Sequence, residues 1–269
     1  MQCIYPSEIK VKGLDQEKIQ VPCGVCRKCR IHRKQAWIGR LRMEAAAHDL
    51  KCFTTLTYSD DQVKDLNYEH IQKFLALYRR RRPSQRIRFF CVGEYGKRTA
   101  RPHWHLCLFG TVCPPDLPEW PHGFSHTGEL NVRSIGYVAG YSLKDSARPE
   151  VVVRCSNRPG IGMEQIFRYG RHIARVRSKL DYVPNSITIG GRRYPLHATA
   201  YRRLLEGFEY EGGLRHEKSL YSCALDHDVK KRLCNGNPEM AENYLGSSRA
   251  SSQGQIRDMN GNGTKEKKI

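Results

Sequence analysis

Two β-rich runs follow each other in the middle of the chain and are joined by a short basic loop. The first is IRFFCVGEYG at residues 87–96, and the second is HWHLCLFG at residues 103–110. Branched and aromatic side chains of this kind favour strands. If the two strands pair as neighbours, residues at the end of the first lie beside residues at the start of the second. The chain is therefore expected to fold around a β-sheet.

The elements around these runs predict the fold class. Asn67 caps a helix that the run RRRRP ends, and Ser134 caps a helix that extends to Lys144. The other expected elements are a helix at residues 31–50, a strand in CFTTLTYSDD at residues 52–61 and a short strand in ELNVR at residues 129–133. This order predicts an α+β fold, with an antiparallel sheet and helices packed against one face.

Four segments are expected along the chain. They are a cysteine-rich segment at residues 1–30, the α+β core at residues 31–150, a C-terminal extension packed on the core at residues 151–245, and a disordered tail at residues 246–269. Within the extension, SITIGGRRYPL is typical of a hairpin with a Gly-Gly turn, and ATAYRRLLEGF is typical of a helix.

His103 and His105 occupy alternate positions of the second strand. Alternate side chains point to the same face of a strand, so both imidazoles can reach one metal ion. Glu94 ends the preceding strand and lies beside the pair if the two strands are neighbours. Two imidazoles and one carboxylate leave coordination positions open for water and a phosphate oxygen. The alternative is two ordinary, partly exposed histidines.

A second polar group lies on the helix expected after Ser134. Tyr137, Tyr141 and Lys144 are spaced at i, i+4 and i+7, which puts them on one helix face. A tyrosine stripe of this spacing commonly serves packing alone. The small residues around the tyrosines and the lysine in line with them favour chemistry instead. A phenol can attack a phosphate that a metal ion polarises.

The charge balance points to a polyanionic partner. The 269 residues include 46 Lys and Arg against 27 Asp and Glu, a net charge of +19. A basic surface of this size attracts phosphates, although a solvated surface can have the same composition. No apolar run approaches the roughly 20 residues of a membrane span, and the N-terminus lacks a signal-peptide core. We therefore expect no membrane partner and a reducing cytoplasm.

The eleven cysteines include a tight cluster at Cys23, Cys26 and Cys29, to which Cys3 can add a fourth thiolate. Four thiolates suit a structural Zn²⁺ held tetrahedrally. The spacing also resembles part of an iron–sulfur run, but the usual fourth cysteine followed by proline is missing. Free cysteines in a basic loop are the third interpretation. Without a secretion signal, metal ligation is favoured over a disulfide framework.

Several motifs, taken in order, resemble one known family. FTTLTY, HWH and YVAGYSLK are similar to the three motifs of the HUH endonuclease superfamily, in the two-tyrosine form found in rolling-circle replication initiators. VPCGVCRKCR, the pairing of GEYG with RPHWH, and SNRPGIG further resemble the replication initiators of microviruses of the gokushovirus type. The resemblance spans about residues 1–210 and implies an HUH-type core related to RRM-like folds.

The resemblance implies a role for each polar residue of these motifs. It implies a divalent cation, Mg²⁺ or Mn²⁺, and a tyrosine that attacks DNA. The ligands are His103 and His105 with Glu94 as the third, the nucleophiles are Tyr137 and Tyr141, and Lys144 assists at the phosphate.

The expected function is a nickase for single-stranded origin DNA. A 5′-phosphotyrosine link would hold the cut strand until it is rejoined, completing rolling-circle replication of a viral single-stranded genome. The basic residues expected to hold the DNA backbone are Arg79, Arg80, Arg81, Arg82, Lys97, Arg98 and Arg101. The resemblance also implies host DNA polymerase and helicase as partners, in the cytoplasm of an infected bacterium. Alternatives are an HUH transposase or relaxase, and a non-catalytic, zinc-containing single-strand binding protein.

Overall fold

The chain divides into two compact units in a computed structural model. One unit is residues 33–165, and the other combines residues 1–32 with residues 166–269. The structure describes residues 3–10, 18–60, 65–96, 99–141, 151–176, 179–180 and 183–215. The expected disordered tail therefore lies outside the described residues. No described helix is long and apolar enough to cross a membrane.

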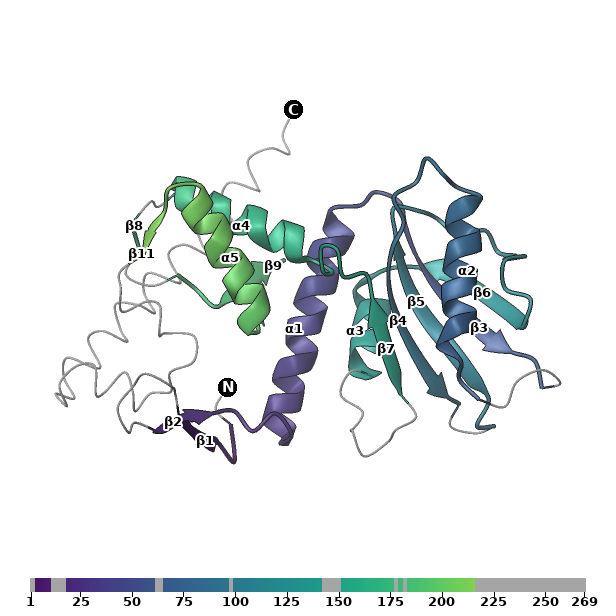
Figure 1. Cartoon of the computed structure of the whole chain (residues 1–269), viewed down its shortest axis with the longest axis horizontal. Coiled ribbons are helices and arrows are strands. Elements are labelled where there is room, and N and C mark those ends of the chain that lie inside the picture. Colours follow the sequence, from purple (N-terminus) through teal and green to yellow (C-terminus); the bar gives the residue numbers. More distant parts are fainter. Residues whose placement is uncertain are drawn as a thin grey trace. The chain divides into compact units, whose positions relative to one another are not determined.

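The unit of residues 33–165 is built on a five-stranded sheet (Figure 1). Its strands lie in the order β6-β3-β5-β4-β7, and every neighbouring pair is antiparallel. The strands are β3 (Lys51–Tyr58), β4 (Arg88–Tyr95), β5 (Pro102–Phe109), β6 (Gly123–Glu129) and β7 (Val152–Cys155). The predicted α+β fold with an antiparallel sheet is confirmed, and β4 and β5 are neighbours as expected.

One face of this sheet packs against helix α2 (Tyr68–Arg80). Alternation along β3 and β5 sends Leu56, Trp104 and Leu106 to this face, where they are fully buried with Ile71 and Phe74 of the helix. The Asn67 side chain accepts a hydrogen bond from the Glu69 amide, so the predicted cap is confirmed. This apolar layer is the main core of the unit.

The opposite face of the sheet is also covered by helices, which corrects the expectation of helices on one face. The Trp37 ring of α1 (Arg27–Ala46) lies 5.0 Å from the Phe90 ring of β4. The Tyr137 ring of α3 (Val132–Tyr141) lies 5.1 Å from the His105 ring of β5. The even residues of β4 and the odd residues of β3 and β5 point to this second face, and they include the polar side chains of interest.

Two expected boundaries are wrong for a local reason. The short strand expected at residues 129–133 does not form, because β6 ends at Glu129 and α3 begins at Val132. Asn131, and not Ser134, caps α3: its side chain accepts hydrogen bonds from the Arg133 and Ser134 amides at 2.9 and 3.1 Å. The Ser134 hydroxyl accepts a hydrogen bond from the Asn131 amide in return, as in a capping box.

The helix expected at residues 31–50 is also displaced toward the N-terminus. It begins at Arg27 and ends at Ala46, so Cys29 lies in its first turn. The amides of Ala47 and His48 bond to carbonyls three residues earlier, which tightens and ends the helix.

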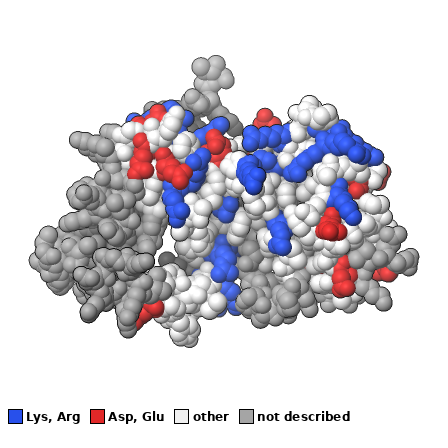
Figure 2. All heavy atoms as spheres, viewed as in Figure 1, with Lys and Arg blue, Asp and Glu red and all other residues white. Residues whose placement is uncertain are grey.

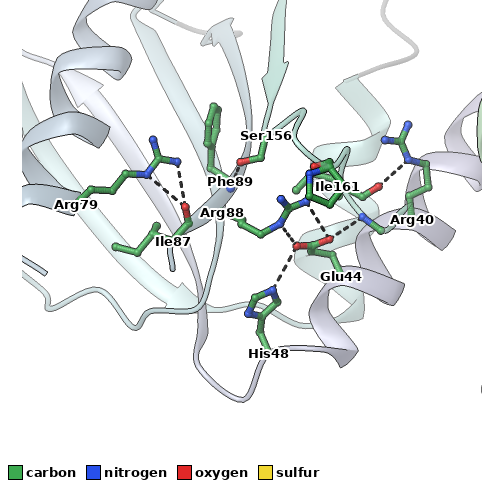
Figure 3. Close-up of polar contacts among 11 residues, drawn as sticks. Arg40, Glu44, His48, Arg79, Ile87, Arg88, Phe89, Ser156 and Ile161 are labelled. Carbon is green, nitrogen blue, oxygen red and sulfur yellow. Dashed lines mark hydrogen bonds and ion pairs between the residues drawn. The ribbon is translucent and has the colours of Figure 1, made fainter. Parts of the chain in front are cut away.

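A buried carboxylate ties α1 to the sheet and to the loop after β7 (Figure 3). Glu44 accepts hydrogen bonds from the Arg88 guanidinium and from the Gly162 amide, the latter at 2.7 Å. The same loop receives a 2.9 Å hydrogen bond from Arg40 at the Ile161 carbonyl. Because a buried charge is costly without such partners, this network fixes the SNRPGIG segment against α1.

The second unit contains helices α4 and α5 and three two-stranded sheets. Its elements are β1 (Ser7–Lys10), β2 (Lys18–Val21), α4 (Met163–Val176), β8 (Lys179–Leu180), β9 (Ser186–Ile189), β10 (Arg192–Pro195), α5 (Ala198–Tyr210) and β11 (Leu214–Arg215). The β9–β10 hairpin turns at Gly190 and Gly191, so the predicted hairpin and the predicted helix after it are both confirmed. The two helices touch closely: a methyl group on Gly170 would lie 2.0 Å from the Leu204 carbonyl oxygen.

Candidate metal and tyrosine site

Strand register brings the predicted ligands to one place on the second face of the sheet. Glu94 of β4 lies directly opposite His103 of β5, and His103 lies opposite Thr57 of β3. Two residues further along the sheet, His105 lies opposite Thr55. Directly opposed residues of antiparallel strands share a face, so these side chains all project to the side that α3 covers.

The two imidazoles converge on a single carboxylate oxygen. The Nε2 atoms of His103 and His105 lie 3.1 and 3.3 Å from Glu94 Oε1. His103 Nδ1 lies 3.1 Å from the Arg101 carbonyl oxygen, and His105 Nδ1 lies 3.0 Å from Thr55 Oγ1. Each ring is therefore anchored through Nδ1 and directs Nε2 at the carboxylate.

This donor set fits a cation. A carbonyl oxygen can only accept, so His103 Nδ1 carries the hydrogen and the Nε2 atom of the neutral ring presents a lone pair to Glu94. Lone pairs that face a carboxylate repel it unless a proton or a metal ion lies between them. One ligand atom from each of Glu94, His103 and His105 lies within 4.8 Å of the others, and Glu94 and His105 are buried. Two imidazoles and a carboxylate suit a divalent transition metal or Mg²⁺ with open positions.

Both predicted tyrosines lie over the histidines, but their environments differ. The Tyr137 side chain is 49% exposed, and its hydroxyl lies 3.4 Å from His105 Nε2. Tyr141 is 8% exposed and its ring stacks on the His105 ring at 5.7 Å. Burial and then hydrogen bonding to Glu94 and Tyr137 raise the pKa of the Tyr141 phenol well above its ordinary value. The arrangement therefore offers one accessible phenol and one enclosed phenol.

Two further residues of the site were not predicted from the sequence. Thr55 holds His105 by the Nδ1 contact described above, and the Phe53 ring stacks on the His105 ring at 5.7 Å. Phe53 also meets the Tyr137 ring edge-on at 6.5 Å. Both belong to the FTTLTY run, in which odd-numbered positions share the face of the histidines. That alternation was the signal that could have identified them.

Most of the predicted basic residues that the structure describes have structural partners. Arg79 donates to the Ile87 carbonyl, Arg81 and Arg82 pair with the buried Glu119, and Arg101 pairs with Asp60. Arg80 is exposed at the end of α2, where Lys and Arg side chains gather (Figure 2). Lys97, Arg98 and Lys144 lie outside the described residues.

The basic end of α2 is remote from the candidate metal site. Arg79 contacts Ile87, the residue just before β4, whereas Glu94 lies near the other end of that strand. Seven residues of extended chain span about 20 Å. These arginines are therefore not first contacts of a phosphate at the histidines.

The predicted cysteine cluster assembles in the other unit. One sulfur from each of Cys3, Cys23, Cys26 and Cys29 lies within 4.8 Å of the others. The Cys3 sulfur lies 3.5 Å from that of Cys23 and 3.8 Å from that of Cys26. Four ligands at the zinc–sulfur distance of about 2.3 Å would be about 3.8 Å apart in a tetrahedron.

Backbone amides make part of this cluster acidic. Hydrogen bonds from the backbone of Ile4 and then Cys29 lower the pKa of Cys26 to about 6, and backbone contacts also lower the pKa of Cys23. Burial raises the pKa of Cys29 to about 12. Metal ligation requires thiolates, and at least two of the four sulfurs ionise readily.

Fold and site together define an α+β protein whose antiparallel sheet carries a candidate metal site under a two-tyrosine helix. Residues 51–146, which contain this site, match the family model of the ORF2-type replication-associated proteins. The chain belongs with the phage replication-associated proteins, so the resemblance expected from its motifs is confirmed at this level.

Three curated phage proteins illustrate the relationship. Replication-associated protein ORF4 of Chlamydia phage 1 is 35% identical over 235 residues, covering 72% of this chain and 57% of that protein. Replication-associated protein ORF2 of Spiroplasma virus 4 is 30% identical over 46% of this chain and 48% of its own length. Replication-associated protein VP4 of Bdellovibrio phage phiMH2K is 29% identical over 47% and 49%. The chain thus spans about half the length of the curated relatives it matches, and no solved structure matches it.

Proposed function

We propose that the protein initiates phage DNA replication as a metal-dependent nickase and strand transferase. The observation that carries this proposal is the convergence of His103, His105 and Glu94 beneath Tyr137. A phosphate bound at such a cation would lie within reach of a phenol that is already exposed. Relatedness to phage replication-associated proteins supports single-stranded origin DNA as the substrate.

The metal site would be held by three side chains. His103 and His105 supply Nε2 and Glu94 supplies a carboxylate oxygen, while the Arg101 carbonyl and Thr55 fix the two rings. A bound Mg²⁺ or Mn²⁺ supplies Lewis-acid polarisation of the scissile phosphate.

The accessible phenol performs the first cleavage. The Tyr137 oxygen loses its proton and forms a bond to phosphorus, and the bond from phosphorus to the 3′-oxygen breaks. That oxygen takes up a proton and leaves as a free 3′-hydroxyl, while Tyr137 keeps the 5′ end as a phosphodiester. Lys144 would assist by offsetting the charge that gathers on the phosphate. The free 3′-hydroxyl primes a host polymerase, with a host helicase opening the duplex.

The enclosed phenol serves the second cleavage. Completing a round requires a second nucleophile while Tyr137 remains esterified, and Tyr141 lies one helical turn away with ring centroids 4.9 Å apart. The phosphotyrosine bond preserves the energy of the broken phosphodiester, so rejoining needs no ATP. This chemistry would take place in the cytoplasm of an infected bacterium, where the phage genome is copied.

The cysteine cluster would hold a structural Zn²⁺. Its sulfur separations match a tetrahedral site around one ion, whereas an iron–sulfur cluster places several atoms between its ligands and needs them farther apart. Cys26→Ser should remove about one equivalent of zinc per chain and lower the melting temperature, while Cys155→Ser leaves the zinc content unchanged. Purified wild-type protein without zinc would contradict this assignment.

A covalent-adduct assay tests the nickase proposal. Protein is incubated with 5′- and 3′-labelled single strands that carry the origin, with Mn²⁺ or with chelator, and adducts are resolved on denaturing gels. We expect a metal-dependent adduct on the 5′ end that the double change Tyr137→Phe and Tyr141→Phe abolishes. DNA binding without any adduct would favour a single-strand binding protein. A transposase or relaxase would give the adduct on its own target strand and none on the phage origin.

A further inference from the structure

The sheet that carries the candidate site ends in an exposed strand. β6 pairs only with β3 among the described strands and forms one edge of the sheet. Its register places Phe124 opposite Thr57 and His126 opposite Thr55. Since Thr57 and Thr55 lie opposite His103 and His105 on their other side, the two β6 residues share the face of the histidines.

Two rows of side chains therefore lead from the metal site to the sheet edge. One row runs from Glu94 through His103 and Thr57 to Phe124, and the other runs from His105 through Thr55 to His126. Neighbouring strands are about 4.8 Å apart, so Phe124 lies about 10 Å from His103 across β3. This is close enough for a nucleotide beside a phosphate held at the histidines.

Phe124 has the properties of a stacking platform. Its side chain is 65% exposed, and the other even residues of β6, His126 and Gly128, are exposed on the same face. A single exposed phenylalanine is common, but one in register with a metal site and two tyrosines is placed for a function. Every base offers a flat face, and stacking on an exposed aromatic ring is how proteins hold single strands without reading their sequence.

We propose that Phe124 and His126 form a nucleotide shelf that stacks and orients the single-stranded DNA next to the scissile phosphate. The proposal rests on the proposed nickase function and adds the path of the strand, which runs across β3 toward the β6 edge. Single-stranded DNA is the occupant that the observations favour, because the shelf is continuous with the phosphate site and the chain carries a net charge of +19. Phe124 supplies the stacking face, and His126 lies beside it opposite Thr55.

Binding of a defined probe tests the shelf apart from catalysis. Fluorescein-labelled oligothymidylate of about 20 nucleotides is titrated with full-length protein in chelator, so that no cleavage occurs. Phe124→Ala and Phe124→Leu should each raise the Kd about tenfold, because both remove the aromatic ring. Phe124→Tyr should bind like wild type. Val112→Ala is the matched control, because Val112 is also exposed and apolar but follows β5 at the opposite end of the sheet.

A second readout reports stacking directly. Replacing one base of the probe with 2-aminopurine should give fluorescence quenching with wild type and Phe124→Tyr, and less quenching with Phe124→Leu. Equal Kd values and equal quenching in all variants would overturn the proposal. Unchanged DNA binding together with a lower sedimentation coefficient of Phe124→Ala would also overturn it, and would assign the β6 edge to contact with a second copy.

The nicking assay is run on the same variants so that the two proposals can fail separately. A wild-type protein that forms no adduct, with Phe124→Ala still weak in binding, would sink the nickase and leave the shelf as a DNA-binding site. A wild-type protein that nicks, with Phe124→Ala normal in binding and in nicking at low DNA concentration, would sink the shelf alone.

Discussion

At the scale of single residues, the site depends on how each histidine is held. The Thr55 hydroxyl contacts Nδ1 of His105, whereas His103 is held by the Arg101 main-chain carbonyl. A side chain can be replaced without moving the strand, and a carbonyl cannot. A group that orients a ligand through its second nitrogen commonly changes metal affinity by about 10- to 100-fold when removed.

We therefore expect Thr55→Val to weaken Mn²⁺ binding about 10- to 100-fold with little change in stability. Calorimetric titration of Mn²⁺ into the protein measures this directly, without DNA. Thr57→Val is the control, because Thr57 lies on the same strand and face, opposite the histidine that the Arg101 carbonyl holds. Equal losses in both variants would mean that β3 as a whole, and not the Thr55 hydroxyl, sets the affinity.

The two tyrosines should differ in the same way that their surroundings do. Tyr137→Phe should reduce the first cleavage roughly a thousandfold or more, because it removes the accessible nucleophile. Tyr141→Phe should keep the first cleavage and lose the second, leaving the covalent adduct to accumulate. Separate gel readouts for cleavage and joining distinguish these outcomes. Equal first-cleavage rates in the two single variants would show that the phenols are interchangeable.

Sequence alone placed the ligands but not this difference between the tyrosines. Glu94 could be assigned because a short loop makes β4 and β5 neighbours, and opposed residues of neighbouring strands share a face. Tyr137 and Tyr141 are one turn apart, so helical periodicity treats them alike. Their unequal exposure depends on where α3 crosses the sheet, and the Thr55 contact joins residues 50 positions apart. Neither can be read from local spacing.

At the scale of secondary-structure elements, the end of α2 shows that a basic run can serve the fold. Burial alone would raise the pKa of the Glu119 carboxyl, but the hydrogen bond from Arg82 and the nearby positive charges outweigh it and hold that pKa below its usual value. Arg82 also donates to the Tyr78 carbonyl and lies over the Tyr78 ring. Composition cannot separate such an arginine from one that binds phosphate.

Arg82→Ala should destabilise the protein by about 2 kcal/mol, because it leaves the buried Glu119 carboxylate with a weaker partner. Arg80→Ala is the control on the same helix and should change the free energy of unfolding little. The pKa of Glu119 is lowered by folding, so this stability is present above its unfolded value and is lost as the pH falls through the folded value. Urea unfolding at about pH 7 and about pH 3 should therefore show a deficit that shrinks in acid. A deficit equal at both pH values would rule out the ion pair as its cause.

The same comparison of sequence with structure holds for helix ends. Ser134 was predicted to cap α3 because serine is a good cap, but Asn131 has the geometry and Ser134 completes the box from inside the helix. Both residues satisfy the sequence rule, and only the end of β6 decides between them. The contact of Glu44 with Gly162 joins segments 118 residues apart and has no local signature.

At the scale of the whole molecule, the net charge of +19 sets how strongly binding depends on salt. Each phosphate neutralised on a single strand contributes about −0.7 to the slope of log K against log salt. A contact with about five phosphates would lower the association constant about 100-fold between about 50 and 200 mM salt. Titration of the oligothymidylate probe across this range tests the expectation. A slope near zero would mean that the positive charge does not face the DNA.

The connection between β6 and α3 also limits how a protein of this kind can vary. Only Leu130 and Asn131 separate the strand that carries Phe124 from the helix that carries both tyrosines. Each residue of an α-helix turns it by about 100°, so one residue inserted early in α3 would rotate the phenols away from the histidines. Substitutions in this stretch can be absorbed side chain by side chain. A change of length cannot, and genes that keep this chemistry should tolerate point mutations here but exclude insertions and deletions.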